Sequence, residues 1–527
     1  MGSKKLQVWL PVLFALVMVL GMVIGFKLRE KTSSISGFLK LNKKNSVQEI
    51  LDLVQSRYVD DITTDSLTNT VIEEILAKLD PHSVYIPAED LKFANEDLQG
   101  NFQGIGVEFQ VFNDTVNVIN VIKDGPSDKA GLKIGDMIVT VDDSINLVKK
   151  EADQIRKALR GPEDSKVKVT IIRNGKPQNI TIERGIIPLP SVDASYMIAP
   201  KTGFIHLSKF SETTYEEFMS SLETLQKKGM EKLILDLRGN GGGFLNEAVQ
   251  MADEFLDGNK LIVFTQGSHI KKTEHHSKRD GLFETGKLVI LIDESSASAS
   301  EVLAGAMQDW DRATIIGRRS FGKGLVQEQY QLSDGAALRL TVARYFTPLG
   351  RNIQKPYTLG RDKYQEEVYN RYSNGELIHG DTSIPVGKPF KTPSGRTVYG
   401  GGGITPDIFV GADSGKLDKT ISTLYTKGTL QNFIYRFYVS NMSTFSQYKD
   451  PVSFSKQYSF GENEWNQLKT FAAKDSIDLS KVPAKDKAET LERMETLMAR
   501  QMWRYEGFYE VYNQTDKIVQ KALEVLK

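Results

Sequence analysis

The spacing of apolar residues changes along the chain, and the first segment that it marks is a continuous uncharged run. This run extends from Trp9 to Phe26 and has lysines on both sides. As a helix, its 18 residues would measure about 27 Å, close to the thickness of a bilayer's hydrocarbon core. The run is longer than most signal-peptide h-regions, and no A-x-A-like site follows it. We therefore expect residues 7–26 to be a retained transmembrane anchor rather than a cleaved signal peptide.

Lysines on both sides of this run leave its orientation open under the positive-inside rule. Because few residues precede the run, we expect residues 1–6 to be cytoplasmic and the large carboxyl-terminal part to lie on the periplasmic or extracellular side of the cell membrane. Residues 27–42 are polar, as is typical of a linker. Residues 43–100 then show helical spacing, and Pro81 ends the second predicted helix.

Short apolar strands separated by glycine turns predict a small β-rich domain at residues 101–186. Residues 187–410 instead contain two buried strands, Leu233–Leu237 and Leu288–Ile292, each followed by a loop and a helix. Such units predict an α/β layer whose loops at the carboxyl ends of the strands bind ligands. Residues 355–400 are interpreted as an insertion in this layer.

Residues 411–527 are predicted to be mainly helical. Apolar residues from Leu491 to Tyr505 recur at helical spacing, which predicts one long amphipathic face packed in a core. The predicted fold is therefore multidomain α/β and β: an α/β core with an inserted β-domain, a helical amino-terminal segment and a mainly helical carboxyl-terminal region.

Composition excludes several kinds of function. Lysine plus arginine equals aspartate plus glutamate at 67 each, which argues against a nucleic-acid partner. The absence of cysteine excludes disulfides, cysteine nucleophiles and thiolate metal sites. The cluster Glu274, His275 and His276 lacks a spaced third ligand, so we predict no metal and no cofactor.

Ser298 follows the second buried strand and begins a predicted helix. With Glu301 it fits the capping box S-x-x-E, so a structural helix cap is one interpretation. The other is a nucleophile on a strand-to-helix turn, where backbone N–H groups stabilise an oxyanion. The glycine run at residues 239–243 could supply one such N–H or form only a flexible turn.

A serine nucleophile needs a base, and none of the six histidines has the neighbours expected of a triad histidine. Lys323 lies among apolar residues and glycines, where desolvation could lower its pKa from about 10.4. Ser320-x-x-Lys323 also matches a penicillin-binding motif, but its glycine disfavours the helix that this motif needs. The stretch from Gly317 to Lys323 nearly matches a phosphate-binding loop, but Gly324 replaces the required hydroxyl residue.

Several short stretches occur along the chain in an order that is typical of one family. They are Leu79-Asp80-Pro81-His82-Ser83, Gly104-Ile105-Gly106-Val107, Gly125-Pro126-Ser127 with Ala130 to Asp136, Leu159-Arg160-Gly161-Pro162, Asp236 to Asn240, Ser296 to Glu301, Phe321 to Gln327, and Gly403-Ile404-x-Pro406-Asp407. Over roughly residues 45–410 the chain resembles the carboxyl-terminal processing peptidases, also called tail-specific proteases.

This resemblance implies a serine endopeptidase with a Ser–Lys dyad. Ser298 would be the nucleophile, Lys323 the general base, and Gln327 would orient the lysine. The implied oxyanion hole consists of backbone N–H groups of Ala299 and of the glycine run, at Gly241 and Gly242.

The resemblance also implies that the β-rich domain is a PDZ domain. Its loop Gly104, Ile105, Gly106 and Val107 would hold the carboxylate of a substrate's C-terminal tail. Arg160 would be a regulatory contact between this domain and the protease. The expected partners are protein or peptide substrates with free C-termini and the membrane, with a homo-oligomer or an adaptor protein as further possibilities. A PDZ scaffold with an inactive protease-like domain and a nucleotide-dependent enzyme are the alternatives.

The anchor can be tested by fractionation. We predict that the full-length protein sediments with membranes, and that a chain lacking residues 1–30 is released and keeps its peptidase activity. Full-length protein recovered in the soluble fraction with its N-terminus intact would contradict the anchor.

Overall fold

The computed structural model describes residues 14–15, 17–23, 46–62, 64–380, 387–413 and 417–527. The chain divides into two units, residues 1–75 and 76–527. The first contains α2 (Ser46–Arg57) and most of α3 (Thr64–Ala77).

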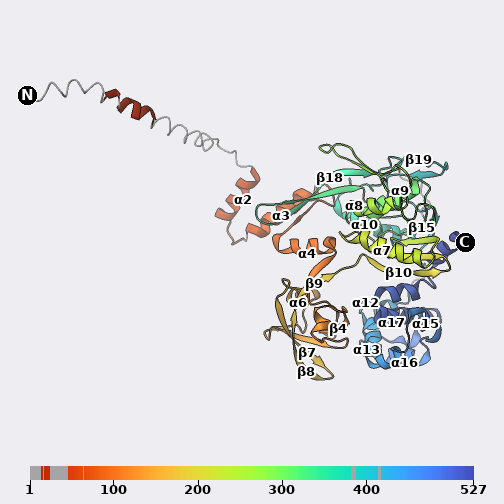
Figure 1. Cartoon of the computed structure of the whole chain (residues 1–527). Helices are drawn as coiled ribbons and strands as arrows, with labels where there is room; N and C mark the ends of the chain where they lie inside the picture. Colours follow the sequence, from red (N-terminus) through yellow and green to blue (C-terminus); the bar gives the residue numbers. More distant parts are fainter. Residues whose placement is uncertain (1–13, 16, 24–45, 63, 381–386, 414–416) are drawn as a thin grey trace, which may run out of the picture. The chain divides into compact units, whose positions relative to one another are not determined.

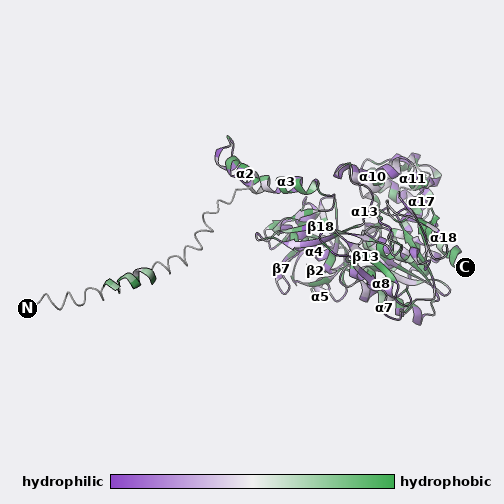
Figure 2. Cartoon of the chain, turned by 90° about the horizontal axis from the view of Figure 1, so that it is seen from above, coloured by the Kyte–Doolittle hydropathy of each residue, from purple (hydrophilic) through white to green (hydrophobic). Residues whose placement is uncertain are grey.

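The predicted anchor at residues 7–26 and the linker at 27–42 lie largely outside the described residues. Residues 17–23 are helical, and Figure 2 shows this short helix in the colour of hydrophobic residues. Among the helices of the described residues, none has the length and apolar character needed to cross a membrane.

The small β-domain in the second unit, in which Figure 1 labels β4, β7 and β8, forms a sheet of strand order β3-β4-β5-β7-β8, with β6 paired to β5. Its main elements are β3 (Val107–Phe112), β4 (Thr115–Val121), α5 (Pro126–Lys129), β5 (Met137–Val141), β6 (Ile145–Asn146), α6 (Ala152–Leu159), β7 (Lys166–Arg173) and β8 (Lys176–Glu183). Buried aliphatic residues, among them Val116, Ile138 and Ile155, form its core. β3 lies at one edge of this sheet, beside α6. Only the side of β3 that faces β4 is paired with another strand of the sheet.

The main sheet has the order β10-β11-β12-β15-β16-β21, and neighbours from β11 onward are parallel. Its strands are β10 (Val192–Ala199), β11 (Thr202–Leu207), β12 (Lys232–Asp236), β15 (Lys287–Ile292), β16 (Thr314–Gly317) and β21 (Ile408–Phe409). Helices on its two faces are α7 (Thr214–Lys227), α8 (Leu245–Asp253) and α9 (Ala299–Asp309) on one side and α18 (Lys517–Leu526) on the other. Leu233 and Leu235 face the first group and Ile234 faces α18, because successive side chains of a strand alternate between faces.

A second sheet, of order β1-β18-β13-β14 with β17 paired to β18, adjoins the loop that carries Lys323. Its strands are β1 (Val84–Ile86), β13 (Leu261–Gln266), β14 (Thr273–His276), β17 (Leu325–Gln331) and β18 (Ala337–Phe346). Three linking elements of the second unit precede or follow the small β-domain: α4 (Ala88–Gln99), β2 (Asn101–Gly104) and β9 (Gly185–Pro188). The predicted insertion holds α10 (Arg361–Ser373), α11 (Glu376–His379), β19 (Pro389–Lys391) and β20 (Thr397–Tyr399).

The carboxyl-terminal region is helical and has its own core, which includes Phe433, Trp465 and Met494. Its elements are α12 (Lys419–Thr426), α13 (Thr429–Ser440), α14 (Met442–Phe445), α15 (Pro451–Gln457), α16 (Glu462–Ala473), the short 3₁₀ helix η1 (Leu479–Lys481), α17 (Ala484–Tyr512) and α18. The predicted fold class, an α/β core with a β-domain and a helical carboxyl-terminal region, is confirmed.

The prediction of one continuous apolar face on the last long helix is wrong in one respect. α17 is broken at Trp503 and Arg504, whose backbone angles are not helical. Met494 and Met498 are fully buried as expected, but Tyr505 beyond the break is 38% exposed. The helical spacing predicts the helix correctly up to the break, and neither Trp503 nor Arg504 is a glycine or proline that would mark a break in the sequence.

Candidate active site

Ser298 lies in a strained turn between β15 and α9. Its backbone angles are φ 55° and ψ −115°, a region that residues other than glycine rarely adopt. Such strain persists only where the surroundings hold it in place, and it often marks a functional turn. Both ends of this turn are fixed, because Ala297 N–H donates to Asn240 O (3.0 Å) and Ser298 N–H donates to Glu301 Oε2 (2.9 Å). The turn presents the serine at the amino end of a buried helix.

The glycine run after β12 packs directly against this serine. A Cβ atom on Gly242 would lie 2.7 Å from Ser298 Cβ and 2.9 Å from Ala299 N, so a larger residue does not fit here. Asn240 holds the run in place by accepting from Gly242 N–H at 2.9 Å and donating to Leu207 O at 2.8 Å. The run is therefore a fixed wall of the site and not only a flexible turn.

Two backbone N–H groups beside Ser298 are suited to bind an oxyanion. Within the described part of the chain, neither the Ala299 N–H nor the Gly241 N–H has a protein acceptor. Gly242, the third predicted donor, has its N–H bound to Asn240 and is not available in this arrangement. Ala299 also begins α9, whose dipole favours negative charge at its amino end.

Lys323 shares a cavity with Ser298. The cavity has a volume of about 590 Å³, and its lining includes Ser298, Ala299, Gly241, Lys323 and Gln327. Burial lowers the pKa of Lys323 below its ordinary value, while the nearby Glu301 carboxylate opposes this shift. A lysine with a lowered pKa is more often neutral near pH 7 and can then accept a proton.

Glu301 joins the two loops that carry Ser298 and Lys323. Its fully buried carboxylate accepts from Ser298 N–H (2.9 Å), Lys323 N–H (2.8 Å) and Gly322 N–H (2.8 Å), and from the hydroxyl of Ser320 (2.5 Å). Burial raises the pKa of Glu301 to about 7, although the four donors favour its charged form. The sequence identified Glu301 only as part of a capping box, because its contacts with residues 320–323 are visible only in the fold.

Tyr345 of β18 also contacts both loops. Its hydroxyl lies 3.1 Å from Ser298 O and within hydrogen-bonding distance of Lys323 O. The tyrosine is nearly fully buried, so its position is fixed. No pattern in the sequence singled it out, since it is one of several alternating apolar residues of a strand.

Gln327 lines the same cavity, but its amide has another partner in this structure. Gln327 Nε2 donates to Thr341 Oγ1 at 3.2 Å, and Thr341 Oγ1 donates to Asp80 Oδ1 at 3.0 Å. Asp80 also accepts the N–H groups of His82 and Ser83. The Leu79–Ser83 stretch thus supports the strands behind the cavity, and the role of Gln327 in orienting Lys323 stays a prediction.

His82 is placed as a structural residue rather than a base. Its Nε2 lies 2.8 Å from the hydroxyl of Tyr364. Burial and then the positive charge of Lys323 lower the pKa of His82 to about 4. The imidazole is therefore neutral near pH 7, and its ring contacts Phe321 and Tyr364.

The predicted insertion supports the loop that carries Lys323. Arg371 of α10 is 1% exposed and donates to Arg319 O (3.1 Å), Ser320 O (2.8 Å) and Phe321 O (3.3 Å). The carboxylate of Glu367, one helical turn earlier in α10, forms an ion pair with Arg371, with 2.6 Å between Arg371 Nε and Glu367 Oε1. Nothing in the sequence distinguishes this arginine from surface arginines, so its role is visible only in the fold.

A second cavity, of about 810 Å³, is lined by β3 and α6 of the small β-domain, by residues of the peptidase core such as Asp193 and Lys209, and by residues 500, 504 and 505 of α17. Ile105, Gly106 and Val107 line it, and Gly106 has a left-handed backbone with φ 74°. Ser127 fixes this loop, because its hydroxyl and its N–H both donate to Ile105 O.

Gly104 ends β2 immediately before this loop and is buried, so a Cβ there would lie 2.8 Å from the Phe102 ring. Arg160 lines the cavity and forms an ion pair with Glu96 of α4, and its guanidinium lies over the rings of Phe93 and Phe102. Arg160 thus connects the small β-domain to a helix outside it.

Comparison with known proteins places this site in a family. Residues 201–360 match peptidase family S41, residues 103–183 match the PDZ domain and residues 420–504 match a family of unknown function. A Staphylococcus epidermidis protein named "Probable CtpA-like serine protease" is 32% identical over 376 residues, covering 68% of this chain and 75% of that protein. A Staphylococcus aureus protein of the same name is 34% identical over 342 residues, covering 63% of this chain and 68% of that one.

Among solved structures, the photosystem II D1 C-terminal processing protease is 28% identical, with a TM-score of 0.35, and the match covers 58% of this chain and 89% of that one. The matched residues 201–360 include both Ser298 and Lys323, and the family match together with these relatives identifies the chain as a serine peptidase. The chain belongs to peptidase family S41 and carries a PDZ domain.

The support given by α10 can be tested at Arg371. We predict that Arg371→Ala destabilises the protein by about 3 kcal/mol, because three backbone carbonyls lose their donor and a fully buried side chain is removed. Peptide hydrolysis should fall at least about tenfold at a temperature where the variant is folded, because the Lys323 loop loses its support. Lys363→Ala, on an exposed part of the same helix, is the matched control. Wild-type activity and thermal stability in Arg371→Ala would contradict this role.

Proposed function

We propose that this S41 peptidase is an endopeptidase that selects proteins by their C-terminal tails and cuts them with a Ser298–Lys323 dyad. The observation that carries the dyad is the shared cavity, in which a buried lysine with a lowered pKa lines the same space as a strained serine. Gly241 and Ala299 in the same lining support the oxyanion site.

In the proposed reaction, neutral Lys323 Nζ takes the proton of Ser298 Oγ while Oγ attacks the carbonyl carbon of the scissile peptide bond. The negative charge that develops on the carbonyl oxygen is stabilised by the N–H groups of Ala299 and Gly241. When the C–N bond breaks, the Lys323 ammonium returns the proton to the leaving amine. A water molecule, deprotonated in the same way, then hydrolyses the Ser298 ester and frees the enzyme.

Tail selection is proposed for the PDZ domain. β3 is an edge strand, so an extended tail can pair with it as an added strand. The Gly104–Val107 stretch lies at the start of β3, where backbone N–H groups would hold the terminal carboxylate. Apolar residues of the cavity lining, such as Phe109 and Leu159, suit an apolar last side chain.

Location at a membrane is also a proposal. It rests on the uncharged run at residues 9–26 and on the exposed apolar side chains of its described part, among them Phe14, Val17 and Leu20. The peptidase and the PDZ domain would then act on the periplasmic or extracellular side.

The dyad is tested by two substitutions that separate a lysine base from a histidine base. Lys323→Arg keeps the positive charge but cannot accept a proton, so cleavage should fall to the level of Ser298→Ala. His82→Ala should lower stability and leave measurable cleavage, since its pKa and contacts give it a structural role. Rates of peptide hydrolysis by folded variants are the measurement. Wild-type cleavage by Lys323→Arg, or complete loss of cleavage in folded His82→Ala, would overturn the mechanism.

A further inference from the structure

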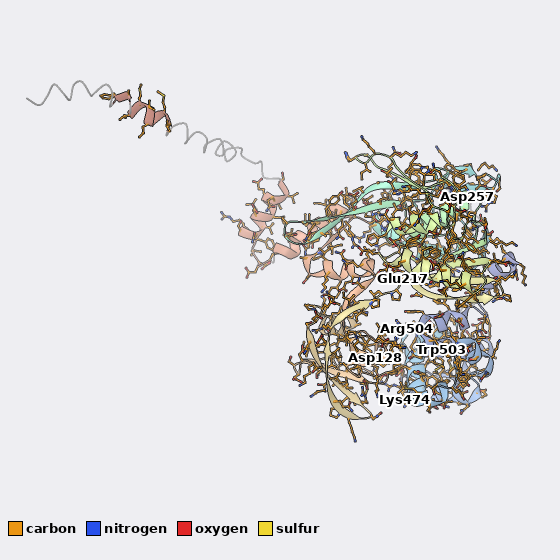
Figure 3. All side chains as sticks on the ribbon, in the orientation of Figure 1. Asp128, Glu217, Asp257, Lys474, Trp503 and Arg504 are labelled. Carbon is orange, nitrogen blue, oxygen red and sulfur yellow. The ribbon has the colours of Figure 1, made fainter. Side chains whose placement is uncertain are left out.

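The tail cavity of the PDZ domain has a wall that comes from another part of the chain. Besides β3 and α6, its lining includes Arg500, Arg504 and Tyr505 of α17 in the carboxyl-terminal region. Figure 3 labels Arg504 beside Trp503 at the break of this helix. The region matching a family of unknown function ends at residue 504, so this wall lies at its border.

The break in α17 gives Arg504 an unusual backbone. Arg504 has φ 58° and ψ −143°, which is strained for a residue with a side chain. Trp503 packs on the core of the carboxyl-terminal region, and a Cβ on Gly507 would lie only 2.7 Å from Trp503 Cβ. Close packing therefore holds the break in place. Such held strain is typical of a functional segment.

Arg504 reaches the edge strand of the PDZ domain. Its Nη2 donates to Glu108 Oε1 at 2.5 Å, and the two side chains are 44% and 30% exposed. Glu108 follows Val107, which lies in the stretch proposed for the terminal carboxylate. A tail added along β3 would therefore pass Arg504 with the residues just before its terminal one.

Arg500 adds a cation without an acidic partner. Its Nη2 donates to the hydroxyl of Tyr505 at 3.1 Å, and its guanidinium lies over the Tyr505 ring. Within the described ranges no carboxylate lies at ion-pair distance from Arg500, whereas Lys209, another cation of the lining, is paired with Asp97 at 2.8 Å. In the α17 wall, formed by Arg500, Arg504 and Tyr505, Arg500 thus offers a positive charge with no paired carboxylate among the described residues, while Arg504 is shared with Glu108 and lies near Asp193.

A separate contact holds the PDZ domain against the carboxyl-terminal region. The Tyr435 hydroxyl of α13 donates to Val118 O at 3.2 Å, and its ring packs with Phe112 and Ile119 in a buried cluster. A Cβ on Gly135 would lie 3.3 Å from Val439 of α13. This buried contact is a second link, besides the Arg504–Glu108 pair, between the PDZ domain and the carboxyl-terminal region.

We propose that the carboxyl-terminal region forms the second wall of the tail site, and that Arg500 and Arg504 select tails with an acidic side chain just before the terminal residue. This inference rests on the proposed tail recognition by the PDZ domain. The occupant is an extended peptide with a free C-terminus, an apolar last residue and an aspartate or glutamate shortly before it. That carboxylate would pair with Arg500 and compete with Glu108 for Arg504.

The test measures peptide binding by fluorescence anisotropy with the uncut full-length Ser298→Ala protein. Labelled peptides of one sequence end in a free valine and carry either glutamate or glutamine at the positions just before it. We expect the glutamate peptide to bind about fivefold more tightly, as for partly exposed ion pairs. Arg500→Gln and Arg504→Gln should each reduce this ratio, and the double variant should bring it near one while the glutamine peptide binds as before.

Two further variants serve as controls. Lys474→Ala removes an exposed positive charge of the same region, labelled in Figure 3 but not in the cavity lining, and should leave the ratio unchanged. Glu108→Gln frees Arg504 and should tighten binding of the glutamate peptide. Equal binding of both peptides by the parent protein, or an unchanged ratio in the double arginine variant, would overturn the inference. An equal loss of binding for both peptides in the arginine variants would show a structural wall without charge selection, which also overturns it.

A third peptide with an amidated C-terminus separates this inference from the proposed function. If the amidated peptide binds as tightly as the free acid, or if no free-acid peptide binds, tail recognition itself is wrong. If the free carboxylate is required but glutamate gives no advantage, only the inference about the α17 wall is wrong.

Discussion

The buried carboxylate of Glu301 accepts hydrogen bonds from the backbone of both Ser298 and Lys323, and the geometry of the site depends on it. A buried charge is costly, and the four donors offset only part of that cost for Glu301, because burial still raises its pKa to about 7. The same charge opposes the effect of burial on the pKa of Lys323. Removing Glu301 would therefore both separate the two loops and alter the protonation of the lysine.

Residues from distant parts of the chain pack around the two loops that Glu301 joins. Gly242 packs against Ser298 from the loop after β12, and Tyr345 of β18 contacts both loops from behind. Arg371 holds the Lys323 loop from α10. On the far side of the main sheet, Arg238 of the glycine loop pairs with Asp516, which caps α18. The carboxyl-terminal region is thus connected to the peptidase through this pair and to the PDZ domain through Arg504.

The sequence predicts most of this where the signal is local. Two buried strands followed by loops predicted the α/β layer, and the position of Ser298 after one of them predicted the serine as a candidate. The apolar and glycine neighbours of Lys323 made it a candidate base, but only the family resemblance paired it with Ser298. Arg371, Tyr345 and the second contacts of Glu301 depend on residues that lie far apart in the sequence, so they emerge only from the fold. The break of α17 has no local signal either, because Trp503 and Arg504 are residue types that a helix accepts, and the close approach of Trp503 to Gly507 is visible only in the structure.

Burial of Lys323 is the central physical claim, and titration of its side chain by NMR tests it most directly. The protein is labelled with ¹³C at the ε-carbon of lysine in the Ser298→Ala background, and the Lys323 signal is assigned by its loss in the Lys323→Arg variant. We predict that burial lets the Lys323 ammonium lose its proton at a pKa below the value of about 10.4 of a free lysine. A midpoint at or above that value would mean that Lys323 stays charged in the working range of the enzyme, and it would contradict its role as the base.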